Sequence, residues 1–169
     1  MNGSVSRRQR KERQFVTCFL EGSLYGIDVL LVREICRCDG VVPVDLAPRS
    51  MIGLMNLRGQ IVTVMDLAAR MGLKGRGEGR PERAIVLKTD AELASIAAAD
   101  LHGAKTGVDL IGLAVDAVGD LVTVDGSQIL PPPSNMADLA ARYLSGVVKL
   151  DDTLMGVLEV ATLSYRAGG

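Results

Sequence analysis

An internal repeat is the feature of this sequence that most constrains its fold. A shift of 93 positions aligns residues 53–66 with residues 146–159 without a gap, including a glycine at the start and a carboxylate at the end. A shift of 86 positions aligns residues 27–35 with residues 113–121. The aligned stretches are short apolar runs, rich in β-branched residues and bounded by glycine turns, which is typical of strands. The sequence therefore predicts a tandem of two related, mainly β halves.

The repeat and the composition together suggest a domain organisation. The halves are expected at about 14–72 and 82–165, joined by a glycine-rich linker at 73–81. With 169 residues, 48% of them apolar, the chain can bury a sizeable core. Within the second half, residues 90–107 interrupt the strand pattern with apolar residues at helical spacing, so we expect a helical insert closed by a glycine.

Local signals predict several turns and short helices. Glu21-Gly22 is expected to connect two strands in a hairpin, and Asp66 is expected to cap a short helix that ends at Gly72. Residues 30–35 fit either a strand or one helical turn. A last short helix is expected at 137–144, after a run of three prolines that rules out regular strand pairing.

Charge and composition exclude several classes of function. The first 13 residues carry five basic residues against one acidic residue, which predicts a flexible basic arm, whereas the remainder has a net charge of −5. That acidic body has three tyrosines, two phenylalanines and no tryptophan, so nucleic-acid binding is not expected. No apolar run approaches the roughly 18 residues that span a bilayer, and we expect no membrane insertion.

No set of residues points to catalysis, a metal or a cofactor. The single histidine, His102, has no nucleophile nearby in the sequence, and the glycines at 75, 77 and 79 lack the spacing of a nucleotide loop. Cys36 and Cys38 are closer together than in the usual zinc knuckle. An odd number of cysteines without an export signal fits a reducing cytoplasm. We therefore expect a cytoplasmic protein that is not an enzyme.

One segment carries a polar group of definite chemistry. Residues 53–59 form a turn bracketed by Gly53 and Gly59 that presents Asn56 and Arg58, and a buried strand follows. A guanidinium on a tight turn offers five donors to a carboxylate or to backbone carbonyls of a partner. The alternative is a solvated arginine that makes only local contacts. The equivalent turn of the second half, residues 149–152, has aspartates instead, so this feature belongs to the first half.

The sequence resembles the CheW family of chemotaxis coupling proteins over about residues 14–163. Five segments carry the resemblance, in the family's order and approximate spacing: Tyr25-Gly-Ile-Asp28, Val32-Arg-Glu-Ile35, Gly53-Leu-Met-Asn-Leu-Arg-Gly-Gln-Ile-Val-Thr-Val-Met-Asp-Leu67, Ile111-Gly-Leu-Ala-Val-Asp116 and Ile129-Leu-Pro-Pro132. The resemblance implies two five-stranded SH3-like β-barrels side by side, with a few short helices. It also implies an adaptor that links chemoreceptor cytoplasmic tips to the regulatory domain of the histidine kinase CheA.

Carried over residue by residue, the resemblance implies a protein-binding surface made of Val32, Glu34, Gly53, Asn56, Arg58 and Gly59. The alternative for Glu34 is that it approaches Arg58 and orients the guanidinium rather than binding a partner itself. Two departures from the family's pattern stand out: Thr63 replaces the usual proline, and the insert at 90–107 is longer than the usual hairpin. A scaffold of a pathway other than flagellar chemotaxis and a small-ligand-binding β-barrel remain as alternatives.

Overall fold

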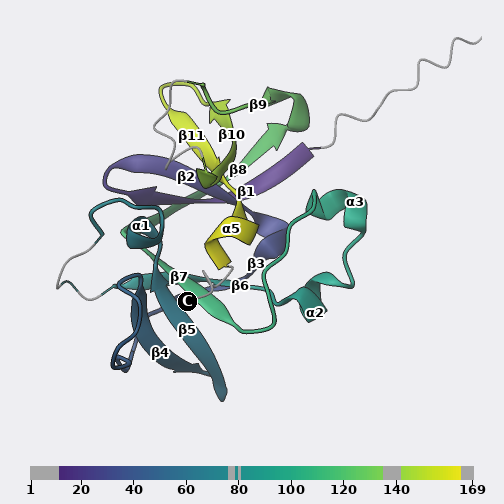
Figure 1. The fold of residues 1–169 in the computed structure, drawn as a ribbon. Coiled ribbons are helices and arrows are strands. Elements are labelled where there is room, and N and C mark those ends of the chain that lie inside the picture. Colours follow the sequence, from purple (N-terminus) through teal and green to yellow (C-terminus); the bar gives the residue numbers. More distant parts are fainter. Residues whose placement is uncertain (1–11, 76–78, 80, 135–141, 165–169) are drawn as a thin grey trace, which may run out of the picture.

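The computed structural model describes residues 12–75, 79, 81–134 and 142–164, and its strands form two sheets (Figure 1). One sheet has the order β8-β1-β2-β11-β10-β9, and the other has the order β3-β6-β7-β5-β4. The strands are β1 (Glu12–Leu20), β2 (Ser23–Asp28), β3 (Val32–Arg37), β4 (Met51–Leu57), β5 (Gln60–Asp66), β6 (Arg83–Leu87), β7 (Ile111–Val115), β8 (Ala117–Asp125), β9 (Ile129–Leu130), β10 (Leu144–Lys149) and β11 (Leu154–Leu158). The predicted mainly β fold class is confirmed.

The strand registers reproduce both sequence repeats. In the β4–β5 hairpin Gly53 pairs with Val64, and in the β10–β11 hairpin Gly146 pairs with Val157, which is the same pairing moved by 93 positions. Each hairpin also has a register irregularity directly before that glycine. The shift of 86 positions moves β3 onto β8, so that Ile35, which pairs with Ile85 of β6, falls on Leu121, which pairs with Val16 of β1. The two halves therefore share one strand architecture.

The two sheets do not coincide with the two halves, however. The β1–β2 hairpin of the first half pairs with β8 and β11, and the β6–β7 hairpin of the second half pairs with β3 and β5. Each half thus gives its first hairpin to the sheet of the other. The expected halves at about 14–72 and 82–165 are therefore interlocked within one domain, because the parallel pairs β2–β11 and β5–β7 join strands of different halves.

Short helices and an apolar core connect the sheets. The helices are η1 (Val29–Leu31), α1 (Leu67–Arg70), α2 (Asp90–Leu93), α3 (Ala98–Leu101), η2 (Gly126–Gln128) and α5 (Val160–Ser164). The largest apolar cluster takes residues from both sheets and from α1 and α5, with Leu67 and Leu163 fully buried. In Figure 1, α5 lies between the sheets. Nε of Arg70 donates to the Leu163 carbonyl at 3.2 Å, which ties α5 to α1.

Most local predictions are confirmed. Glu21 and Gly22 both have positive φ, 50° and 81°, as a two-residue hairpin turn requires. Asp66 caps α1 by accepting from the Ala69 amide at 3.2 Å. Residues 30–35, for which a strand and a helical turn were both expected, are divided between the two. The helical turn η1 ends at Leu31, and the strand β3 begins at Val32. No helix among the described residues has the length and apolar character needed to cross a membrane.

The insert differs from its prediction in form. It contains two four-residue helices, because Ala97 adopts an extended ψ of 130° between them. Its base is closed by Asp90, whose amide donates to the Gly107 carbonyl at 2.8 Å and whose carboxylate accepts from the Thr106 amide at 2.7 Å. Leu93 is 3% exposed and belongs to the main core. The insert is thus built into the domain.

Two predicted boundaries, that of the N-terminal arm and that of the last helix, also differ from the structure. β1 begins at Glu12, so Glu12 and Arg13 of the expected arm at 1–13 belong to a strand, and residues 1–11 lie outside the described residues. Nη2 of Arg13 lies 2.9 Å from Oδ2 of Asp28, which explains why this basic residue belongs to the sheet. Residues 135–141 of the last predicted helix lie outside the described residues, and Leu144, its predicted last residue, begins β10.

Candidate functional site

The β4–β5 hairpin presents Arg58 on a two-residue turn. Leu57 pairs with Gln60, and the residues between them have positive φ, 51° at Arg58 and 83° at Gly59. This combination is typical of a type I′ turn, which suits the right-handed twist of the strands. Oδ1 of Asn56 accepts from the Gly59 amide at 2.9 Å. Asn56 and Gly59 therefore build the turn, and Arg58 projects from it.

Glu34, on β3, forms an ion pair with Arg58 on the β4–β5 turn. Nη2 of Arg58 lies 3.4 Å from Oε1 of Glu34, which confirms the expected approach. The arginine side chain is 80% exposed, whereas the glutamate is 21% exposed. An ion pair of this exposure contributes little to stability, at most about 1 kcal/mol, but it favours one direction for the guanidinium. The arrangement leaves an oriented, accessible donor fork at the protein surface.

A second pair of contacts at this turn was missed by the sequence analysis. Nη2 of Arg33 donates to Oε1 of Gln60 at 2.7 Å, directly beside the turn. Nη1 of the same guanidinium lies 3.6 Å from Oε1 of Glu92 in the insert. No local signal marked Arg33, because its partners lie far away in the sequence and only the strand pairing brings them together. We refer to Arg33, Glu34, Asn56, Arg58, Gly59 and Gln60 as the turn site.

Two predicted site residues, Val32 and Gly53, pack within the fold behind the turn. Val32 is half-buried and packs against the main apolar cluster. Gly53 is buried, and a Cβ added there would lie 2.2 Å from the Val42 carbonyl oxygen. That carbonyl accepts from the Leu54 amide at 2.8 Å. Gly53 therefore permits the close approach of two backbones and is not accessible at the turn site.

Cys18 and Cys36 are poor candidates for nucleophiles or metal ligands. Burial raises the pKa of Cys18 to about 12, with a smaller contribution from Asp116. Burial also raises the pKa of Cys36, with Glu34 as a secondary cause. Both thiols stay protonated at neutral pH, and the thiolate is the reactive form. Within the described part of the chain, no three His, Cys, Asp or Glu side chains group in a way that could hold a metal ion.

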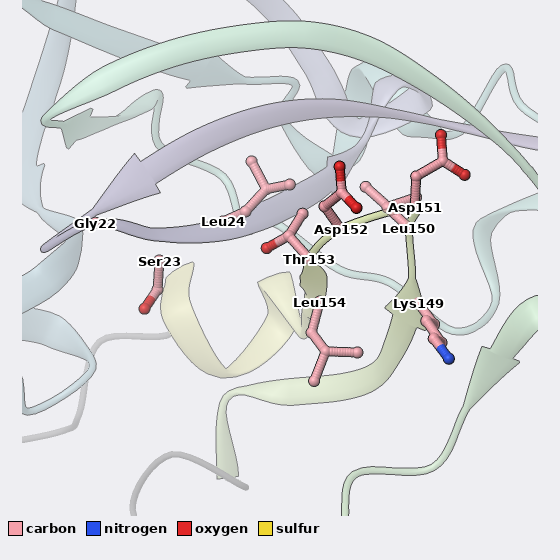
Figure 2. A pocket seen from close by; sticks show the side chains of 9 residues that line it. All are labelled: Gly22, Ser23, Leu24, Lys149, Leu150, Asp151, Asp152, Thr153 and Leu154. Carbon is pink, nitrogen blue, oxygen red and sulfur yellow. The ribbon is translucent and has the colours of Figure 1, made fainter.

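A surface hollow of about 540 Å³ lies on the other sheet, between the β1–β2 and β10–β11 turns (Figure 2). It is lined by Gly22, Ser23, Leu24, Lys149, Leu150, Asp151, Asp152, Thr153 and Leu154. This lining contains the turn equivalent to the one that carries Arg58. It includes neither a histidine nor a cysteine, and its polar groups come from two exposed turns.

A match to a known protein family assigns the chain to that family. The CheW-like domain matches residues 14–167, nearly the whole chain. The chain belongs to the CheW-like domain family. All six predicted site residues lie within the residues that match this domain.

Individual CheW-like relatives agree along most of their lengths. The chain is 26% identical over 163 residues to a probable chemotaxis protein CheW of Rhizobium etli, covering 96% of this chain and 94% of that protein. It is 28% identical over 147 residues to protein FrzA of Myxococcus xanthus, covering 86% and 80%. The crystal structure of the scaffolding protein TtCheW from Thermoanaerobacter tengcongensis matches with a TM-score of 0.73 and 26% identity, covering 94% and 92%.

Proposed function

We propose that this protein is a non-enzymatic chemotaxis adaptor that couples methyl-accepting chemoreceptors to a CheA-type histidine kinase in cytoplasmic signalling arrays. The observation that carries the proposal is the exposed Arg58 on a tight turn of a CheW-like domain, oriented by its ion pair with Glu34. The names of the relatives, chemotaxis proteins and a scaffolding protein, support the same class of function.

The adaptor acts by binding two partners at the same time. Holding receptor and kinase on one body raises their effective concentration and fixes their relative orientation, without any chemical step. The turn site suits a partner that offers a carboxylate or backbone carbonyls, because the Arg58 guanidinium is a planar donor fork. Asn56, Gly59 and Glu34 shape and orient this fork, while Val32 and Gly53 support the strands behind it.

The test is a calorimetric titration of the protein against the regulatory domain of a CheA-type kinase and against a receptor cytoplasmic tip from the same organism. Binding of both partners at micromolar strength or better supports the adaptor. Asp151→Ala is the matched control for Arg58→Ala, because a shift of 93 positions places it in the equivalent turn. Failure to bind either partner would overturn the proposal.

The insert favours a second candidate, a scaffold of a chemosensory pathway other than flagellar chemotaxis. It is longer than the usual family hairpin, and it is anchored to the core through Leu93 and to the turn site through Glu92. A partner of a different pathway would then contact both the insert and the turn. Binding to a non-flagellar kinase paralogue in preference to the flagellar one distinguishes the two candidates.

A further inference from the structure

A single guanidinium, that of Arg33, links the helical insert to the turn site. It donates to Oε1 of Gln60 at 2.7 Å and lies 3.6 Å from Oε1 of Glu92. Gln60 directly follows Gly59, so this hydrogen bond acts on the residue that closes the Arg58 turn. The Arg33 side chain is 30% exposed and that of Glu92 is 37% exposed, so the link is partly sheltered from solvent.

Glu92 is itself held in place by the start of α2. Its Oε1 atom accepts from both the amide and the hydroxyl of Thr89, each at 3.3 Å, and its own amide donates to the Thr89 hydroxyl at 3.4 Å. This reciprocal capping arrangement fixes the glutamate rotamer. The next residue, Leu93, is buried in the main core. Arg33 therefore meets a carboxylate whose position is set by the insert.

A bulge in β3 explains why two neighbouring residues both reach the turn site. The pairing of β3 with β6 shifts between Val32 and Glu34, so Arg33 is the extra residue of the strand. A bulge changes the direction of the side chains and bends the strand locally. Arg33 and Glu34 consequently contact Gln60 and Arg58, the residues on either side of Gly59.

We infer that Arg33 is a positioning residue of the turn site and that Glu92, through its ion pair with Arg33, couples the helical insert to this site. The inference rests on the proposed function. The exposed pair of Arg58 with Glu34 confines the turn only weakly. The contact of Arg33 with Gln60 adds a second fixed point, and a turn that is already ordered loses less conformational entropy when a partner binds. The insert thus sets how firmly Arg58 is presented.

A double-mutant cycle tests whether Arg33 acts through Arg58. Kinase and receptor titrations are compared for the wild type, Arg33→Ala, Arg58→Ala and the double variant. Arg33→Ala is expected to weaken binding about three- to tenfold in the wild-type background and to have no further effect once Arg58 is removed. Arg37→Ala, on the same strand, is the matched control and should bind like the wild type, because Arg37 and its ion-pair partner Asp39, 4.0 Å away, are both exposed. Equal losses with and without Arg58 would overturn the inference.

A second measurement does not depend on any partner. The NMR signals of the Gly59 amide and the Arg58 Nε–H group are expected to shift in Arg33→Ala and, to a smaller extent, in Glu92→Gln, but not in Arg37→Ala. Unchanged signals in Arg33→Ala and Glu92→Gln would overturn the link between insert and turn. If these signals shift and the wild type binds neither kinase nor receptor, the proposed function fails while the structural link stands.

Discussion

Oε1 of Glu34 lies 3.4 Å from Nη2 of Arg58, although Glu34 belongs to β3 and Arg58 to the turn between β4 and β5, two strands that are not neighbours of β3 in the sheet order. The glutamate is mostly covered and the arginine is mostly exposed. The covered partner thus gives the exposed one a preferred direction without enclosing it. Such an arrangement suits recognition better than stability, because most of the guanidinium remains available to another molecule.

Replacing Arg58 by alanine should weaken partner binding by about 2–4 kcal/mol, as is typical of a charged contact at the centre of an interface. The fold should be unaffected, because the side chain lies on an exposed turn. Calorimetric titration measures the binding loss, and thermal unfolding measures the stability. Asp151→Ala, in the equivalent turn, should change neither quantity. Normal binding by Arg58→Ala would reduce the arginine to a solvated turn residue.

Replacing Glu34 by glutamine should have a smaller effect, at most about 1 kcal/mol of binding free energy, because it removes only the orienting charge. The loss should shrink as salt is added, since an exposed ion pair is screened. Titrations at low and high ionic strength measure both effects. A loss as large as that of Arg58→Ala would show that Glu34 contacts the partner directly.

Gly53 and Gly59 should respond very differently to alanine. At Gly53 the new methyl group would lie 2.2 Å from the Val42 carbonyl oxygen, so the backbone at Val42 must move away from β4 and the cost should be about 3 kcal/mol or more. At Gly59 there is open space, and only the positive φ of 83° is unfavourable, at about 1 kcal/mol. Chemical denaturation of both variants gives the comparison. Similar losses would contradict the close approach at Gly53.

The sequence predicted the repeat, the strands and the arginine turn because each has a local signal: a recurring apolar pattern, a β-branched run or a glycine pair. It did not predict the exchange of hairpins. Paired residues such as Val16 and Leu121 lie far apart in the sequence, and no local pattern indicates that they pair. The role of Arg33 was missed for the same reason. The insert was predicted as one helix because its apolar spacing continues through Ala97, where the backbone turns extended.

Replacing Arg13 by alanine should destabilise the fold by about 2–4 kcal/mol, because it leaves the buried carboxylate of Asp28 without its ion-pair partner. The guanidinium also lies 5.1 Å from the centre of the Phe15 ring, a contact that adds to the loss. Chemical denaturation measures the change. Arg37→Ala, whose pair is exposed, should stay within about 0.5 kcal/mol of the wild type. No difference between the two variants would place Arg13 outside the folded domain.

The closure of the insert should depend on pH. The hydrogen bond from the Thr106 amide is the main cause that lowers the pKa of Asp90 below its ordinary 3.8. The folded state therefore gains stability from the ionised carboxylate above pH 3.8, and this gain is lost as the pH falls through the lower, folded value. The NMR shift of the Thr106 amide should titrate with a midpoint below 3.8. In Asp90→Asn this titration should disappear, and a midpoint at or above 3.8 would contradict the closure.

The exchange of hairpins between the two halves has a consequence for the origin of the domain. A single repeat on its own would expose the strand edges that β1–β2 and β6–β7 now cover in the opposite half. Such a unit could complete its pairing only with a second copy, through a twofold-symmetric swapped dimer. Fusion of two copies into one chain removes the concentration dependence of that assembly. It also frees each copy to diverge, and the equivalent turns now carry an arginine in one half and aspartates in the other.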